Sequence, residues 1–117
     1  MTEEQKVKLC DIGVDLDETL ERFVDNEDLY FRCLNKLLQD SNYQNMLDAI
    51  ENANAEAAFD YAHALKGVSA NLGLDKLYRE MKTITEVFRA GSLAFDLDNM
   101  DRLKSSYEEA CEIIKSL

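Results

Sequence analysis

Residues 62–73, AHALKGVSANLG, form the centre around which this chain is organised, and they include its only histidine, His63. Asn54 and Gly73 bracket a proline-free run of helical length, and its apolar residues recur at helical spacing. At 100° per residue, one narrow stripe forms from Ala58, Ala62, Leu65, Ser69 and Leu72. His63 points roughly 140° away from the centre of that stripe. The sequence therefore predicts a helix that buries the stripe and exposes the histidine.

The expected neighbours of His63 are Phe59, Lys66 and Gly67, with Ala70 one turn further on, because residues three and four apart share a helix face. A glycine inside a helix costs about 0.5–1 kcal/mol relative to alanine. One explanation for Gly67 is that a glycine beside the imidazole leaves no side chain to obstruct a large docking partner. Lys66 places a cation within reach of an anionic group on the ring. The alternative is a surface histidine with no task, beside an ordinary solvated lysine.

This pattern resembles the histidine-containing phosphotransfer (HPt) family, in which His-x-Leu-Lys-Gly, a run of small residues and Leu/Ile-Gly surround a phosphorylated histidine. The residues that match at that spacing are His63, Leu65, Lys66, Gly67, Leu72 and Gly73. The likeness extends from about residue 13 to the C-terminus, because the flanking helical pattern is of the same kind.

The resemblance implies that His63 is the phosphoacceptor and that Lys66 attracts and stabilises the phosphoryl group. Phe59, Gly67 and Ala70 would then form the surface on which a partner docks. Gly73 is adequately explained as a helix C-terminal residue. Histidine suits the acceptor role because a neutral ring nitrogen is available near neutral pH.

Three residues of the next helix, Lys82, Thr85 and Arg89, are expected to lie to one side of its apolar stripe, with Tyr78 near them. Family members often carry a longer Glu or Gln where Thr85 stands, and that residue can support the imidazole. Thr85 is shorter, so the sequence does not decide whether it forms a hydrogen bond to the ring. Lys82 and Arg89 either add positive potential near the site or are ordinary surface charge.

The function that the resemblance implies is that of a carrier in a two-component phosphorelay. His63 would accept a phosphoryl group from a receiver-domain phospho-aspartate and pass it to an aspartate on another receiver domain. The expected partners are therefore the receiver domains of response regulators and hybrid histidine kinases. Mg²⁺ is expected on the receiver, and the chain is expected to need no cofactor of its own.

The chain contains no GxxxxGK[ST], no kinase glycine-rich loop and no GxGxxG. We therefore expect a phosphotransfer intermediate, a histidine phosphotransferase without ATP-dependent kinase activity. Two alternatives stay open. One is a phosphoacceptor phosphorylated directly by the catalytic domain of a separate histidine kinase, and the other is a non-phosphorylated helical interaction module.

Composition narrows the class of protein. At 117 residues, with 46% hydrophobic and 32% charged residues, the chain is expected to form one domain over residues 1–117. A net charge of −11 argues against nucleic acid and anionic membranes as partners, because phosphates require a basic face. No apolar run approaches the roughly 20 residues of a membrane helix. The polar, acidic start, MTEEQ, is unlike a secretory signal.

Cys10, Cys33 and Cys111 form no CxxC pair, and one histidine cannot complete a zinc set at the usual spacing, so no metal site is expected. Cys33 and Cys111 fall on apolar helix faces and are interpreted as small buried hydrophobes. A reducing cytoplasm is the expected location, and an isolated carrier has no need to be more than a monomer.

The predicted fold is all-α, an up-and-down antiparallel four-helix bundle with additional short N-terminal helices. Residues 1–13 would hold an extension helix with Val7 and Cys10 on one side. A helix over about 15–25 would begin at Asp15 and bury Leu16, Leu20, Phe23 and Val24. Further helices are expected over about 27–40, 43–51, 55–72 and 74–90. The last would begin at about residue 93 or 95.

Overall fold

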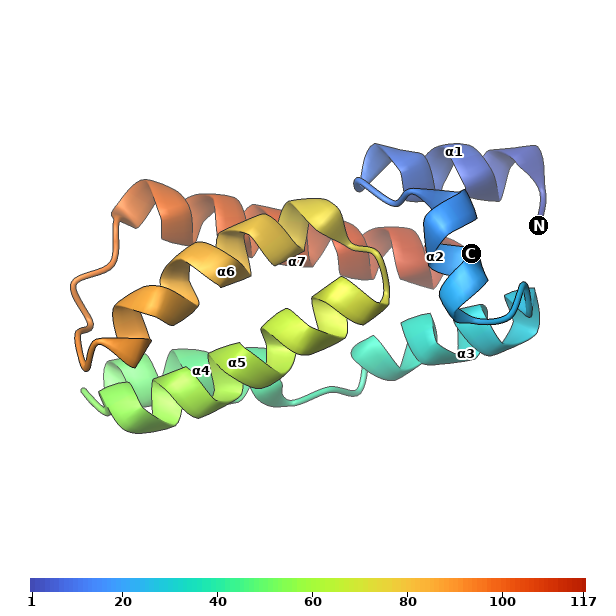
Figure 1. Cartoon of the computed structure of the whole chain (residues 1–117). Helices are drawn as coiled ribbons and strands as arrows, with labels where there is room; N and C mark the ends of the chain where they lie inside the picture. Colours follow the sequence, from blue (N-terminus) through green and yellow to red (C-terminus); the bar gives the residue numbers. More distant parts are fainter.

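The structure, a computed structural model, describes residues 1–117 and contains seven helices and no strand (Figure 1). The all-α prediction is therefore confirmed. The helices are α1 (Glu3–Asp11), α2 (Leu16–Arg22), α3 (Glu27–Leu37), α4 (Asn42–Glu51), α5 (Ala55–Asn71), α6 (Asp75–Arg89) and α7 (Leu97–Ser116). None of them combines the length and the apolar character that a bilayer crossing requires.

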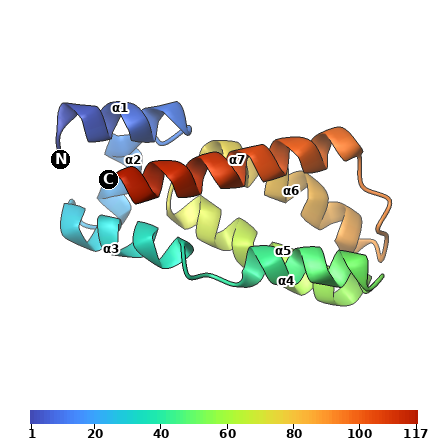
Figure 2. The same ribbon diagram turned by 180° about the vertical axis from the view of Figure 1, so that it is seen from behind.

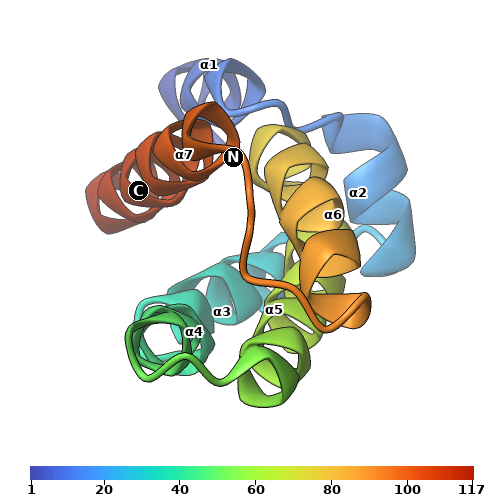
Figure 3. The same ribbon diagram turned by 90° about the vertical axis from the view of Figure 1, so that its left-hand side faces the viewer.

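Four antiparallel columns make up the bundle, and the whole chain measures 43 × 24 × 22 Å. Viewed along its length, α4, α5, α6 and α7 occupy separate corners, and α3 lies behind α4 (Figure 3). The first column is thus two successive short helices, α3 and α4, and the other three are single helices. The N-terminal helices α1 and α2 lie at the end of the bundle where α7 finishes (Figure 2). The predicted architecture is confirmed, with the first column divided.

Helix α5 packs between α4 and α6, its two main neighbours. Its predicted stripe is buried, and Ala58, Ala62 and Ser69 are small enough to let both neighbours approach closely. Leu65, fully buried, contributes about 1.5–3 kcal/mol by leaving water. The Ser69 hydroxyl donates to the Leu65 carbonyl at 2.8 Å, so its burial leaves no polar group unpaired.

A buried hydrogen bond fixes the end of α5. The hydroxyl of Tyr30, on α3, donates to the carbonyl of Leu72 at 2.8 Å. Burial raises the pKa of Tyr30 well above its ordinary value, so the hydroxyl keeps its proton. Gly73 follows with φ +72, which confirms the predicted helix end.

Several helices begin with a side-chain cap, and the sequence predicted one of these caps, Asp15. The side chains of Asp15, Asn26 and Asn54 each accept a backbone N–H from the first turn of the helix that follows. Glu18, placed in the sequence where a capping box would use it, pairs instead with Arg22 at 3.3 Å. Asp15 is therefore confirmed as the cap of α2, but the reciprocal hydrogen bond of a capping box is not formed.

Three predicted boundaries are wrong. The helix expected over 15–25 ends at Arg22, because Val24 and Asp25 adopt φ of +55 and +56, and Val24 is 87% exposed instead of buried. The helix expected over 27–40 ends at Leu37, because the chain turns before α4 and the Asp40 carboxylate accepts the Asn42 N–H there.

The last helix starts at Leu97 and not at residue 93 or 95, because Asp96 caps it and accepts the Asp98 N–H. Phe95 belongs to the preceding loop and packs edge-on against Phe88. An extension helix does form within residues 1–13, but its buried residue is Leu9, whereas Val7 and Cys10 are exposed.

All three cysteines are free thiols. Cys33 and Cys111 are half-buried, less enclosed than their apolar faces predict. Burial raises the pKa of the Cys111 thiol, which keeps it protonated and unreactive near neutral pH.

Gly73 and Gly91 both have positive φ, but only Gly73 is crowded by a neighbouring side chain. Alanine substitutions at the two positions therefore distinguish backbone strain from steric crowding. A Cβ at Gly73 would collide with the Thr19 side chain, whereas one at Gly91, φ +78, would meet no atom within 4 Å. We expect Gly91→Ala to lower the free energy of unfolding by about 1–2 kcal/mol through backbone strain. Gly73→Ala should cost about 1–3 kcal/mol more, through overpacking against Thr19. Urea denaturation measures both, and equal losses would contradict the crowding.

Candidate functional site

His63 lies on the outer face of α5, exposed as predicted. Asn54 caps the helix, because its side chain accepts the Ala57 N–H at 3.0 Å. The buried stripe of α5 turns the histidine away from α4 and α6. Neither ring nitrogen makes a hydrogen bond or an ion pair within the chain. The fold therefore makes no polar contact with this imidazole, and the side chain is exposed.

The contacts of His63 are aromatic. Its ring stacks on that of Phe59, one turn earlier, with centroids 5.5 Å apart and planes inclined by 29°. The guanidinium carbon of Arg89, from α6, lies 4.8 Å from the centroid of the same Phe59 ring. Glu86 accepts from the Arg89 Nε at 3.2 Å. The structure therefore brings together Phe59, His63 and Arg89, three of the residues singled out in the sequence.

The backbone beyond His63 is uncovered. Gly67 is exposed, and a Cβ there would meet no atom within 4 Å. Ala70, one turn further, is exposed as well. At the end of this strip, Arg22 of α2 donates to the Ala70 carbonyl at 3.1 Å and so ties α2 to the last turn of α5. A partner can therefore approach His63 along α5 without displacing any side chain at Gly67.

The two lysines stand apart from the aromatic contacts. Lys66 is half-buried on α5 and forms no ion pair. Lys82 is exposed on α6 and lines a shallow hollow of about 340 Å³ with Asp75, Tyr78 and Arg79. No hydrogen bond joins Lys82 to His63.

Thr85 does not lie beside the apolar stripe of α6, where the sequence placed it, but within it. Its side chain is fully buried, and its hydroxyl donates to the Met81 carbonyl at 2.6 Å. Met81 and Phe88 are buried on the same face, because residues three and four apart share it. The supporting role considered for Thr85 is therefore corrected: its hydroxyl makes no hydrogen bond to the imidazole.

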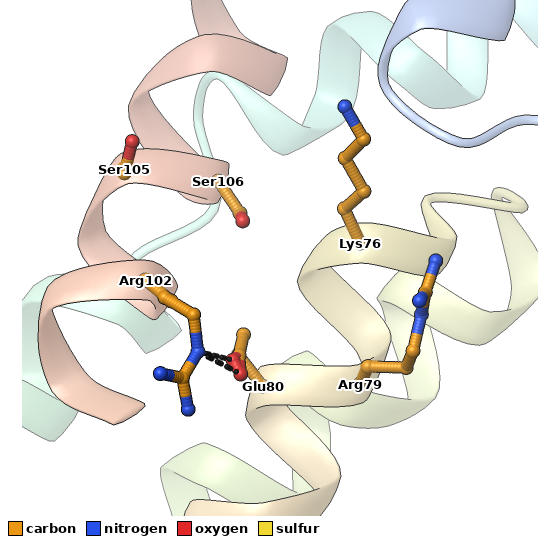
Figure 4. A pocket seen from close by; sticks show the side chains of 6 residues that line it. All are labelled: Lys76, Arg79, Glu80, Arg102, Ser105 and Ser106. Carbon is orange, nitrogen blue, oxygen red and sulfur yellow. Dashed lines mark hydrogen bonds and ion pairs between the residues drawn. The ribbon is translucent and has the colours of Figure 1, made fainter. Parts of the chain in front are cut away.

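A cavity away from His63 lies between α6 and α7 (Figure 4). It measures about 360 Å³, and its six lining residues are all polar. Arg102 pairs with Glu80 at 2.9 Å, and this hydrogen bond raises the pKa of the guanidinium. The side chains of Lys76 and Arg79 extend away from that pair (Figure 4), so the cations do not converge on one point. His63 lines neither this cavity nor the hollow beside Lys82.

Two contributors to this region, Glu86 and Arg22, were not singled out in the sequence. The spacing of Glu86 and Arg89, three residues apart on one helix, is a signal that could have indicated their ion pair. The contact between Arg22 and Ala70 joins residues far apart in the chain, and no local pattern indicates it.

Comparison with known proteins gives one match. The family model described as the Hpt domain matches residues 18–113, which is most of the chain and includes all of α3 to α6. No curated protein and no solved structure matches the chain.

Gly67→Ala tests whether the uncovered glycine serves the fold. We expect the free energy of unfolding to rise by about 0.5–1 kcal/mol, because alanine suits a helix interior better and its methyl group would meet no neighbour. Urea denaturation measures the change. A loss of stability would contradict the open helical environment, and Gly91→Ala, with its positive φ, supplies a control of opposite sign.

Proposed function

Because the chain belongs to the Hpt domain family, we propose that it is a phosphorelay carrier that accepts a phosphoryl group on His63 from a receiver-domain phospho-aspartate and passes it to another receiver. Membership of the family assigns the chain to histidine phosphotransfer in phosphorelay signalling. The observation that supports His63 as the acceptor is its exposure, free of internal hydrogen bonds, beside the uncovered backbone at Gly67.

The proposed step is a direct transfer between two side chains. The lone pair of a neutral ring nitrogen of His63 attacks the phosphorus of the aspartyl phosphate. A nitrogen–phosphorus bond forms as the bond from phosphorus to the aspartate oxygen breaks, and the aspartate leaves as a carboxylate. Passing the group to a second receiver reverses these events. Such transfers depend on positioning and charge stabilisation, and we expect Mg²⁺ to be held by the receiver.

The convex shape of the site agrees with this division of labour. His63 is exposed on α5 and does not line the cavity between α6 and α7, so we expect the receiver to supply the pocket in which transfer occurs. Gly67 and Ala70 leave room for that pocket's rim, and the half-buried ring of Phe59 borders it on the other side. We therefore expect docking over the face of α5 that carries Phe59, Gly67 and Ala70.

Two cations counter the acidic character of the chain near the acceptor. Lys66 follows His63 by three residues, and it can attract and stabilise the phosphoryl group as a point charge. Arg89 lies 4.8 Å and the imidazole 5.5 Å from the Phe59 centroid, so the guanidinium is at most about 10 Å from the imidazole, about one Debye length at 0.1 M salt. An anionic group on His63 would therefore experience the charge of Arg89, reduced by that of its ion-pair partner Glu86.

The proposal is tested by label transfer. A panel of receiver domains phosphorylated on aspartate with radiolabelled acetyl phosphate is purified from the donor and mixed with the chain. We expect label on the wild type and none on His63→Gln, whose free energy of unfolding should stay within about 0.5 kcal/mol of the wild type because the side chain is exposed. If the wild type gains label only from a histidine kinase with ATP, the relay function is contradicted. If it never gains an acid-labile phosphate, the chain is a non-phosphorylated interaction module and not a carrier.

Docking over Gly67 is tested with Gly67→Phe. The ring should obstruct the receiver and lower the transfer rate at subsaturating receiver by at least about tenfold, which corresponds to about 1.4 kcal/mol. Ser105→Phe is the matched control, because Ser105 is an exposed, neutral residue on α7, diagonally across the bundle from α5 (Figure 3). Equal transfer rates for the two variants would contradict docking at this face.

A further inference from the structure

The orientation of the His63 ring has no polar explanation within the chain. A histidine that reacts through one nitrogen is commonly oriented by a hydrogen bond to the other, yet neither nitrogen of His63 has such a partner. The hydroxyl of Thr85, on the neighbouring helix, is committed to the Met81 carbonyl. An exposed side chain without contacts changes rotamer within picoseconds to nanoseconds. Any restraint on this ring must therefore come from packing.

Phe59 supplies that packing. Its ring lies 5.5 Å from the imidazole, centroid to centroid, with the planes inclined by only 29°. An offset stack of this kind restricts rotation of the imidazole about both side-chain torsions. Phe59 itself is half-buried and packs against the hydrophobic core, and this packing restricts the motion of its ring.

Arg89 holds the Phe59 ring from the neighbouring helix. Its guanidinium carbon is 4.8 Å from the ring centroid, and its Nε donates to Glu86 at 3.2 Å, so both contacts favour the same guanidinium orientation. Phe59 and His63 belong to α5, whereas Glu86 and Arg89 belong to α6. The position of the imidazole is thus linked to the packing of α6 on α5.

We propose that Phe59 is a positioning residue, which holds the imidazole of His63 in the orientation that transfer requires, and that Arg89 acts through Phe59 by clamping its ring. This inference rests on the proposed function, since it concerns how readily the bound receiver meets the acceptor nitrogen. A fixed nucleophile reacts faster than one that must be selected from several rotamers. Phe59 therefore affects the transfer step itself as well as bordering the docking face.

The stack is tested in the full chain by nuclear magnetic resonance, without any partner. The carbon-bound ring protons of His63 should be displaced from their positions in an unstructured peptide by the ring current of Phe59. Phe59→Leu should remove most of this displacement, and Phe59→Tyr should retain it. Phe31→Leu, which alters a half-buried phenylalanine on α3, is the matched control and should leave the His63 protons unchanged.

Transfer kinetics with a phosphorylated receiver test the consequence. At saturating receiver, Phe59→Leu should lower the maximal transfer rate by about tenfold, with recovery in Phe59→Tyr. A change in the half-saturating receiver concentration would report the contribution of Phe59 to docking. Arg89→Ala should reduce both the ring-current displacement and the maximal rate. Arg79→Ala, which removes an exposed arginine from the same helix, should change neither.

The outcomes separate this inference from the function on which it rests. Phe59→Leu with unchanged His63 ring protons, or with a weaker half-saturation and an unchanged maximal rate, would overturn the positioning role while the carrier function stands. Wild type that accepts no label from any receiver would overturn the carrier function and the inference with it. Loss of the ring-current displacement together with a reduced maximal rate, restored by tyrosine, would support both.

Discussion

The burial of one stripe of small and branched side chains on α5 is the constraint on which the rest of the structure depends. The stripe is fully buried between α4 and α6 and consists of Ala58, Ala62, Leu65 and Ser69. Because of the helical period, His63 then lies on the opposite, outward face of α5. Any rotation of α5 that hid the imidazole would bring the stripe into water at a cost of several kcal/mol. The exposure of His63 is therefore enforced by the core.

Separating the core from the acceptor has a chemical consequence. The apolar residues of the bundle pack α5 against α4 and α6, and α7 against α6 and α3. The ring stacked against the imidazole is that of Phe59. The site is a protruding side chain bordered by Phe59, by the open backbone at Gly67 and by two cations. Such a surface cannot enclose a small substrate, but it can enter the concave site of another protein. The geometry thus favours a partner that brings its own catalytic pocket.

The sequence predicted the helices, the fold class and the outward direction of His63, because helical periodicity is a local property that caps and apolar spacing record directly. It misjudged residues whose environment depends on distant segments. Thr85 is polar by composition but falls on the buried face of α6, and Val24 is apolar but occupies a left-handed turn that exposes it. The stack of Arg89 on Phe59 joins two helices, and no pattern within either one indicates it.

The central claim, that His63 itself carries the phosphoryl group, is tested most directly by the ³¹P spectrum of the ring-¹⁵N-labelled chain after incubation with phosphorylated receiver. The account predicts one phosphorus signal that is split by coupling to a ring nitrogen and that disappears in acid but persists in base. Because the chain has a single histidine, that coupling would identify the residue. A signal that shows no coupling to nitrogen, or that survives acid, would contradict it.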